Sequence, residues 1–472
     1  MHDFRFEDIE NLSVELPEDI LKRKWHGDFK GANRLIGIWL EKDILPALRE
    51  KLILEREILN RLPLEYPFTY EEAFAKLQGF VPDLTEEEFR TLQDEGRIDW
   101  IYVEGEERFF NRFAETLLRV NRQIMDRADS ACSKAPLEKC PEESLERQSR
   151  EQGKQALLRV IRQIREQGGA ECRFRVRASL QIKEDSFRKG RVKVHIPVPA
   201  ESSQLADIQI HASSGEYVPA PPESAQRAVC FEEDMQENHE FWVEYSYRNR
   251  VDYVEMKPEE VTPVNPGDFA EYKWEQLPHI RFTPYMKALA EQLTGGVENP
   301  LEKARNIYDY ITTHVEYSFV RNYFTIENLP EYAAVGGKGD CGIQALMFIT
   351  LCRIAGVPAR WQSGLYTTPY SAGCHDWAQV YIAPYGWRYV DCSFGGSAFR
   401  EGDEERRKFY FGNLDPFRMV ANSRFQQEFD VKKSFLRIDP YDNQRGEAEY
   451  ADRGLGEEEV VWKADIVACD MA

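Results

Sequence analysis

The chain has 472 residues, of which 42% are hydrophobic and 12% aromatic, enough apolar material for sizeable cores and about three domains. Its formal net charge of −21 excludes a protein that binds nucleic acid by bulk electrostatic attraction, because phosphate binding needs an excess of Lys and Arg. The same charge excludes docking on an anionic membrane, and no apolar run reaches the roughly 20 residues that span a bilayer.

The first stretch, MHDFRFEDIENLSVELPEDI, has neither the basic start nor the apolar segment of a secretory leader. The nine cysteines are odd in number and scattered through the chain, which favours reduced thiols. We therefore expect a cytoplasmic protein.

Residues 1–165 are expected to form a mainly helical domain. One helical stripe carries five leucines: Leu45, Leu48, Leu52, Leu59 and Leu62. Capping boxes then predict two helix starts, Thr69 with Glu72 and Thr85 with Glu88. RIDWIYVEGEERFF follows as a predicted hairpin that turns at Glu104-Gly105.

Helix, helix, hairpin is also the order of a winged-helix unit, which would suggest DNA binding. The second helix and the hairpin, however, are acidic, with Glu86, Glu87, Glu88, Asp94, Glu95, Asp99, Glu104, Glu106 and Glu107. These charges would repel phosphate. We therefore expect no nucleic-acid partner and interpret the domain as one for packing or for binding a protein partner.

A polar segment with two prolines, Ser133–Gln152, is predicted to hold a linker or loop. Residues 170–256 then change to a period of two, which predicts a small antiparallel β domain of the sandwich type. Its clearest alternating runs are Cys172–Ile182, Val192–Val198 and Phe241–Tyr247. Met256–Phe269 carries three prolines and is predicted to be a linker.

Residues 267–430 are expected to form a mixed domain, so the chain is predicted to be an α+β multidomain protein. Asn299 and Pro300 begin one helix, and Asp340 caps a second that ends at Gly356 and Pro358. Three predicted strands follow: ARWQSGLYT, HDWAQVYIA and WRYVDCS. Residues 431–472 are expected to be an acidic C-terminal extension, with one more strand in EEEVVWKADIVA.

Cys341 directly follows the helix cap and is the best candidate for a nucleophile. The positive end of a helix dipole favours a thiolate, and the thiolate is the reactive form. Cys352, near the end of the same helix, is instead expected in the core.

A nucleophilic thiol needs a base and a residue that orients it. His375 and Asp391 are the candidates, on consecutive predicted strands. A simple hairpin centred on Tyr385 would place Asp391 opposite Gln379 and about 13 Å along the strand from His375. A bulge, an asymmetric loop or strong twist must close that gap.

GDCGIQALMFITLCRIAGVPAR, GCHDWAQVYI and GWRYVDCS together resemble the three core motifs of the transglutaminase-like superfamily, over about residues 280–400. That superfamily has a papain-like core and includes calcium-dependent transglutaminases, peptide N-glycanases and many bacterial proteins assigned as cysteine proteases. The resemblance implies Cys341 as nucleophile, His375 as general base and acid, and Asp391 as the orienting residue.

Two departures from the family pattern are Cys392, where many relatives have proline, and Cys374 before His375. These two are interpreted as small buried residues, although redox partners of Cys341 or a metal site are alternatives. We expect no metal and no cofactor. Tyr317 is the preferred side-chain donor for an oxyanion, and Trp377 and Trp361 are candidate walls of a substrate cleft.

The predicted function is a cysteine-dependent amide or peptide hydrolase that forms a thioester, with a peptide or amide as its substrate. Acyl transfer to amines is the first alternative, although no EF-hand calcium loop is present. Peptide deglycosylation is the second, but no CxxC pair suggests the structural zinc of peptide N-glycanases. A non-catalytic interaction scaffold is the third. The oligomeric state is not predicted.

Overall fold

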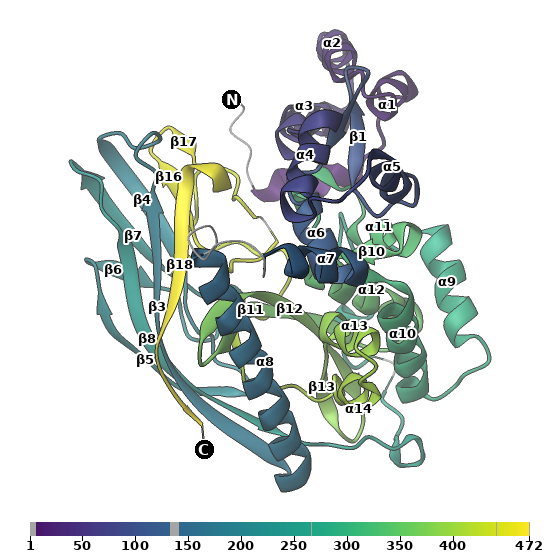
Figure 1. The fold of residues 1–472 in the computed structure, drawn as a ribbon, viewed down its shortest axis with the longest axis vertical. Coiled ribbons are helices and arrows are strands. Elements are labelled where there is room, and N and C mark those ends of the chain that lie inside the picture. The colour runs from purple at the N-terminus through teal and green to yellow at the C-terminus, as the bar shows by residue number, and fades with distance from the viewer. Residues whose placement is uncertain (1–5, 133–140, 266, 440, 472) are drawn as a thin grey trace.

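The structure is a computed structural model that describes residues 6–132, 141–265, 267–439 and 441–471. It is an α+β protein in three parts (Figure 1): an N-terminal helical part, a β part of two antiparallel sheets, and a papain-like core in which helices surround a third antiparallel sheet. This architecture confirms the predicted fold class. None of the described helices is both long and apolar enough to cross a membrane.

The helical part contains a 3₁₀ helix, seven helices and one hairpin: η1 (Phe6–Ser13), α1 (Glu18–Trp25), α2 (Phe29–Leu40), α3 (Pro46–Glu65), α4 (Tyr70–Phe80), α5 (Glu86–Asp94), β1 (Trp100–Val103), β2 (Glu106–Phe109), α6 (Phe113–Val120) and α7 (Arg122–Cys132). Both predicted capping boxes form at α4 and α5. The hairpin turns at Glu104-Gly105 as predicted, with positive φ at both residues.

Two expectations for this part are corrected. Leu45 is 77% exposed because it precedes α3 as its cap, whereas Leu52, Leu59 and Leu62 are buried. The predicted linker Ser133–Gln152 is a helix from Pro141 onward, since α8 spans Pro141–Gln167 and packs along the β part. The rest of that prediction, residues 133–140, lies outside the described residues.

The β part consists of two sheets that lie against one another (Figure 1), in the orders β18-β3-β8-β5 and β17-β16-β4-β7-β6. Its strands are β3 (Gly169–Ile182), β4 (Gly190–Pro197), β5 (Leu205–Ser213), β6 (Tyr217–Pro219), β7 (Ala228–Met235), β8 (Phe241–Asp252), β16 (Glu447–Tyr450), β17 (Arg453–Gly454) and β18 (Val460–Met471). In the alternating runs of β3 and β8, the apolar side chains face the buried interior.

The C-terminal residues correct the expected separate extension. β16 pairs antiparallel with β4, and β18 pairs along nearly the whole of β3, so the chain returns from the core to complete both sheets. The strand in EEEVVWKADIVA is confirmed as β18. Its partner is distant in sequence, and a pairing of this kind is not visible in local patterns.

The core sheet has the order β14-β13-β12-β11-β15. Its strands are β11 (Ala359–Thr368), β12 (Ser371–Ile382), β13 (Gly386–Val390), β14 (Phe411–Gly412) and β15 (Arg418–Asn422). The surrounding elements are α9 (Pro284–Thr294), α10 (Pro300–His314), η5 (Tyr323–Thr325), α11 (Leu329–Gly336), α12 (Cys341–Ile354), α13 (Cys392–Arg400) and α14 (Glu404–Phe409), with the short parallel pair β9 (Glu316–Tyr317) and β10 (Lys338–Gly339).

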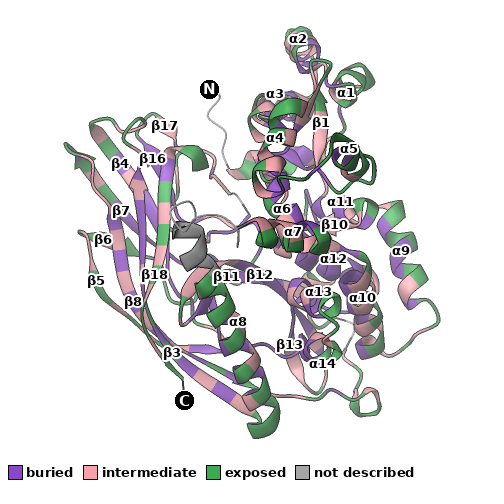
Figure 2. Ribbon diagram, viewed as in Figure 1, coloured by how far each residue is buried: buried purple, intermediate pink, exposed green. Residues whose placement is uncertain are grey.

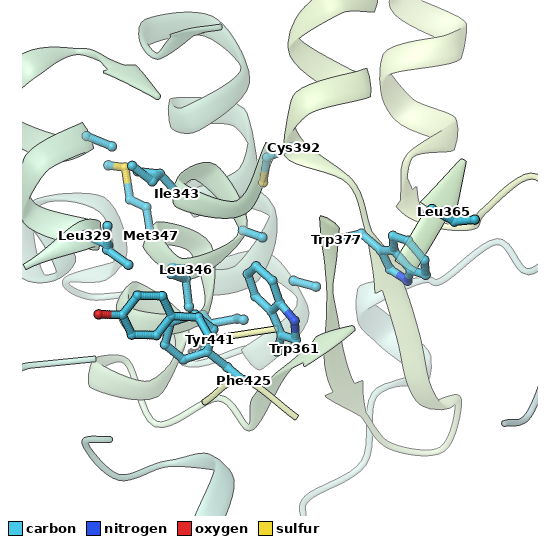
Figure 3. Packing of buried hydrophobic residues seen from close by; sticks show 14 of the residues in the cluster. Leu329, Ile343, Leu346, Met347, Trp361, Leu365, Trp377, Cys392, Phe425 and Tyr441 are labelled. Carbon is cyan, nitrogen blue, oxygen red and sulfur yellow. The ribbon is translucent and has the colours of Figure 1, made fainter. Parts of the chain in front are cut away.

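The central helix α12 is buried from Gly342 to Arg353 (Figure 2), which explains its nearly uniform apolar sequence. Ile343, Leu346 and Met347 pack between Leu329 and an aromatic group of Trp361, Phe425 and Tyr441 (Figure 3). Because β10 ends directly before α12, the strand pair β9-β10 fixes where the helix begins.

The other two parts meet the core near this helix start. Arg97 and Thr116 of the helical part bond to Glu316 and to the Phe319 backbone, beside β9. On the opposite side, Asn249 of β8 donates to the Arg418 carbonyl oxygen of β15 at 2.6 Å. The helical part therefore contacts the core beside β9, and the β part contacts it at β15.

Candidate functional site

Cys341 is the first residue of α12. The Asp340 side chain caps the helix by accepting a 3.0 Å hydrogen bond from the Ile343 backbone N–H. Cys341 is partly exposed, whereas Cys352, about three turns further along, is buried as predicted. The predicted position of Cys341 at the helix start is confirmed.

The sulfur lies beside an open edge of β12. Strand β13 pairs only with the Ala378–Ile382 half of β12, which leaves the edge at His375 and Asp376 free on that side. Cys341 Sγ lies 3.1 Å from Asp376 Oδ2, and the Asp376 backbone N–H also faces the sulfur. Since neighbouring side chains of a strand point to opposite faces, His375 and Asp376 project on either side of this edge.

His375 and Asp391 are brought together. His375 Nε2 lies 2.8 Å from Asp391 Oδ2, and both residues are buried. The expected register is corrected by two residues: Ala378 pairs with Val390, so Asp391 follows level with Trp377 instead of Gln379. The smaller offset lets the two side chains meet without a bulge.

Asp391 has a second cationic partner that the sequence did not reveal. The fully buried guanidinium of Arg418 lies with Nη1 3.1 Å from Asp391 Oδ2 and Nη2 2.8 Å from Asp415 Oδ2. The guanidinium also lies over the Phe394 ring. A charged residue inside the otherwise apolar strand FRMVA was the available signal.

Burial lowers the pKa of His375, and the positive charge of Arg418 adds to this effect, while Asp391 opposes it. Burial alone would raise the pKa of Asp391, but His375 and Arg418 outweigh it and keep the pKa below its usual value. The pair is therefore a neutral imidazole bonded to an ionised carboxylate. An ionised Asp391 accepts the Nε2 proton, so Nδ1 carries the free lone pair.

The thiolate expected at Cys341 is corrected. Burial raises the pKa of the Cys341 thiol well above its ordinary value, and the negative charges of Asp376 and Asp340 raise it further. The positive end of the α12 dipole would favour a thiolate. The Asp340 carboxylate that caps α12 lies at the same end of the helix and opposes this effect. Within the described residues, the thiol donates to Asp376, and His375 is bonded to Asp391.

Asp376 is itself held by a network from the C-terminal segment. Gln444 Nε2 donates to Asp376 Oδ1 and, at 3.1 Å, to the His375 carbonyl oxygen. Asp442, which accepts from Ser363, also hydrogen bonds to Asp376. Burial and the nearby Asp340 raise the pKa of Asp376 to about 7. The sequence interpretation gave Asp376 no role.

Gly342 has a steric reason next to Cys341. A Cβ at this position would lie 2.3 Å from the Tyr323 hydroxyl oxygen and 3.0 Å from Asp376 Oδ2. That hydroxyl donates to Asp340 Oδ1, so Tyr323 ties η5 to the helix cap. The glycine after the cysteine therefore lets three polar side chains approach the helix start.

Tyr317, the candidate oxyanion donor, lies on β9 in register with Gly339 of β10. It is buried, and Arg119 lies over its ring. Burial raises the pKa of Tyr317, and the charge of an ionised Cys341 would raise it further. Its role as a donor stays a prediction.

The two tryptophans correct the expected cleft walls. Trp377 is 0% exposed and donates to Gln362 Oε1 at 2.7 Å, and Trp361 is 3% exposed and donates to Ser363 Oγ. They lie on opposite faces of the sheet (Figure 3) and both belong to the core. Cys392, at the start of α13, is buried as expected, whereas Cys374 is partly exposed, which corrects the expectation for that residue.

Residues 287–392 match the family described as the Transglutaminase-like superfamily. This segment of the chain is therefore a transglutaminase-like core, as the motifs predicted. The match includes Cys341, His375 and Asp391, and it ends before Arg418. No curated protein matches the chain.

Three solved structures are similar to this chain. One is described as "a Putative Cysteine Protease from Cytophaga hutchinsonii", with 15% identity and a TM-score of 0.37 over 64% of this chain and 90% of that one. The periplasmic domain of TgpA from Pseudomonas aeruginosa has 12% identity and a TM-score of 0.29, over 51% and 92%. A protein described as "a Putative Protease from Parabacteroides distasonis" has 14% identity and a TM-score of 0.21, over 43% of each chain.

Proposed function

We propose that the chain is a cysteine-dependent amide or peptide hydrolase that works through Cys341, His375 and Asp391. The observation that carries the proposal is a helix-start thiol beside the strand segment whose histidine is already bonded to a buried carboxylate. Covalent catalysis requires a nucleophile, a base and a residue that orients the base. The superfamily match over these residues supports the same roles.

In the proposed reaction, His375 Nδ1 accepts the thiol proton while Cys341 Sγ attacks an amide carbonyl carbon. The π electrons of the carbonyl move to its oxygen, where the Cys341 backbone N–H and the Tyr317 hydroxyl would donate hydrogen bonds. The imidazolium then protonates the leaving amine as the C–N bond breaks, which leaves a thioester. Water, deprotonated by His375, attacks the thioester and releases a carboxylic acid and the free thiol.

Arg418 contributes indirectly by keeping Asp391 ionised. An ionised Asp391 holds the His375 tautomer in which Nδ1 is the acceptor, and it stabilises the imidazolium that forms during attack. The positive charge of Arg418 would also lower the proton affinity of the His375 imidazole. A base of lower proton affinity gives its proton readily to the leaving amine.

The test is an amide screen with the full-length chain, with and without an added primary amine. Peptides that contain glutamine, asparagine and ordinary backbone amides serve as substrates, and Cys341→Ala is the control. Ammonia release together with the free carboxylic acid, or backbone cleavage, supports the hydrolase where it depends on Cys341. Incorporated amine, which is also accompanied by ammonia release, supports acyl transfer instead. Hydrolysis that survives in Cys341→Ala contradicts the proposal.

A further inference from the structure

Asp376 contacts the reacting sulfur from the face of β12 opposite to His375. Its Oδ2 lies 3.1 Å from Cys341 Sγ, and the residue is 8% exposed. We propose that Asp376 is a fourth residue of the active site, which accepts the S–H hydrogen bond of Cys341 in the resting enzyme and holds the nucleophile as a neutral thiol. This inference rests on the proposed function, in which His375 takes that proton during attack.

The carboxyl group of Asp376 is fixed in this position from behind. Gln444 donates to its Oδ1 and to the backbone carbonyl of His375, so one side chain ties Asp376 to the strand. Asp442 is bonded to Asp376 and to Ser363 on β11. With Oδ1 occupied by Gln444, the free oxygen Oδ2 is directed at the sulfur.

Apart from His375, the proposed base, the titratable groups that act on the sulfur come from four elements, and their ionised forms are all anionic. They are Asp340 at the cap of α12, Tyr317 on β9, Tyr323 on η5 and Asp376 on β12. Behind Asp376 lie Asp442 and Asp439, and burial raises the pKa of both carboxyls. The arginines of this region act on other groups, Arg112 on Asp340 and Arg445 on Cys374.

The Cys341 thiol and the His375 imidazole, between which the proton moves, are consequently both neutral in the resting enzyme. A negative neighbour disfavours a thiolate by Coulomb repulsion, and the hydrogen bond to Asp376 uses the thiol proton. On the other face, the neutral imidazole of His375 has its acceptor nitrogen free. The attack therefore needs base assistance, in contrast to an enzyme that stores a thiolate beside an imidazolium.

The step balances without any added reagent. At rest the proton stays on sulfur and the S–H bond is only polarised toward Asp376. During attack this bond breaks, its electron pair forms the new S–C bond, and the proton moves to His375 Nδ1. Asp376 exchanges no proton in this step and is left without its donor, which favours return of the proton when the thiol is regenerated.

A titration of the wild-type chain tests the resting state directly. The thiolate absorbs near 240 nm, so the absorbance difference between wild type and Cys341→Ser is recorded from pH 5 to 10. An ordinary cysteine titrates near about 8.5. We expect the Cys341 signal to be absent at pH 7 and to rise only above the ordinary range. A thiolate signal at pH 7 would overturn the inference.

The role of Asp376 is tested by alkylation of Asp376→Asn with iodoacetamide, mapped by mass spectrometry. The comparison is made at pH 8, where Asp376 is mostly ionised because its pKa is about 7. Loss of the charge should lower the pKa of Cys341 by about one unit or more, so alkylation should be roughly tenfold faster. Asp376→Glu, which keeps the charge, should stay slow. Cys469 on β18 is partly exposed and serves as a reference thiol whose rate should not change.

An unchanged or slower rate at Cys341 in Asp376→Asn would overturn the inference. If that variant does not fold, the wild-type titration decides alone. The outcome is separable from the proposed function. If Cys341 is a neutral thiol but the chain shows no Cys341-dependent hydrolysis, the proposed function is wrong and the role of Asp376 stands. If the chain hydrolyses amides through Cys341 but carries a thiolate at pH 7, the role of Asp376 is wrong and the proposed function stands.

Discussion

His375 and Asp391 are joined by a 2.8 Å hydrogen bond, although no ladder pair places them opposite one another. Asp391 stands where β13 ends and also caps α13 by accepting from the Phe394 backbone N–H at 2.9 Å. The carboxylate therefore has one oxygen for the helix and the other for His375 and Arg418. Asp391 is therefore fixed in position because it follows the end of β13 and also caps α13.

Asp391→Asn should abolish the acceptor function of His375 Nδ1. An amide can donate to Nε2, which would move the ring proton to Nδ1 and leave no base for the thiol. We expect kcat to fall by roughly 10²–10⁴-fold with little change in KM. His211→Ala is the control, because His211 lies on β5 and, among the residues that the structure describes, bonds to Ser246 within the β part. Equal activity of the two variants would contradict this role.

Arg418→Met should destabilise the fold because it leaves two buried carboxylates, Asp391 and Asp415, without their shared cation. Removal of one partner from a buried ion network costs roughly 3–5 kcal/mol. Arg191→Met is the matched control, since Arg191 forms an exposed pair with Glu232 worth at most about 1 kcal/mol. Urea unfolding measures both variants, and similar losses would argue against the buried network.

Asp376 should make stability depend on pH in a defined direction. Its pKa is about 7 when folded and near 3.8 ordinarily, so between these values the folded chain binds the proton more tightly than the unfolded chain. The free energy of unfolding therefore falls as pH rises, by at most about 1.4 kcal/mol per unit from this group. Asp376→Asn removes this contribution.

The variant should consequently gain stability relative to wild type as pH rises from 5 to 7. Urea unfolding of both chains at several pH values measures the difference. If the difference does not vary with pH, the raised pKa is wrong.

Gly342→Ala should impair the site although alanine is the better helix former. The added Cβ would force the Tyr323 hydroxyl away and break its bond to Asp340. Gly79→Ala in α4, where nothing lies within 4 Å of the new Cβ, should instead stabilise the chain by roughly 0.5–1 kcal/mol. Adding Tyr323→Phe to Gly342→Ala removes the blocking oxygen and should relieve the clash. Without that relief, the proposed steric cause fails.

Local patterns in the sequence were sufficient for the helix start at Cys341, for both capping boxes and for the alternating strands of the β part. These features depend on neighbours a few residues away. The pairing of β18 with β3 was missed because it joins residues almost 300 positions apart, and no local signal encodes it. The first turns of α8 were missed because they are polar and begin at the second of two closely spaced prolines.

The residues of the site that belong to the three sequence motifs and carry typical catalytic groups could be predicted. Cys341, His375 and Asp391 were named from residue type and spacing, but the register between the last two depended on the turn before Gly386. Asp376 and Arg418 were missed for a different reason. Their importance lies in what they contact: the thiol pKa depends on Asp376 and Asp340, and Gln444 of the C-terminal segment holds Asp376 in place.

The most direct test of the account is to identify the residue that carries the acyl group during turnover. The full-length chain is mixed with an amide substrate found in the screen, quenched in acid and analysed by peptide mapping. The account predicts an acyl mass on Cys341 that hydroxylamine removes and that is absent from Cys341→Ala. An acyl group on another residue, or undiminished amide turnover by Cys341→Ala, would contradict it.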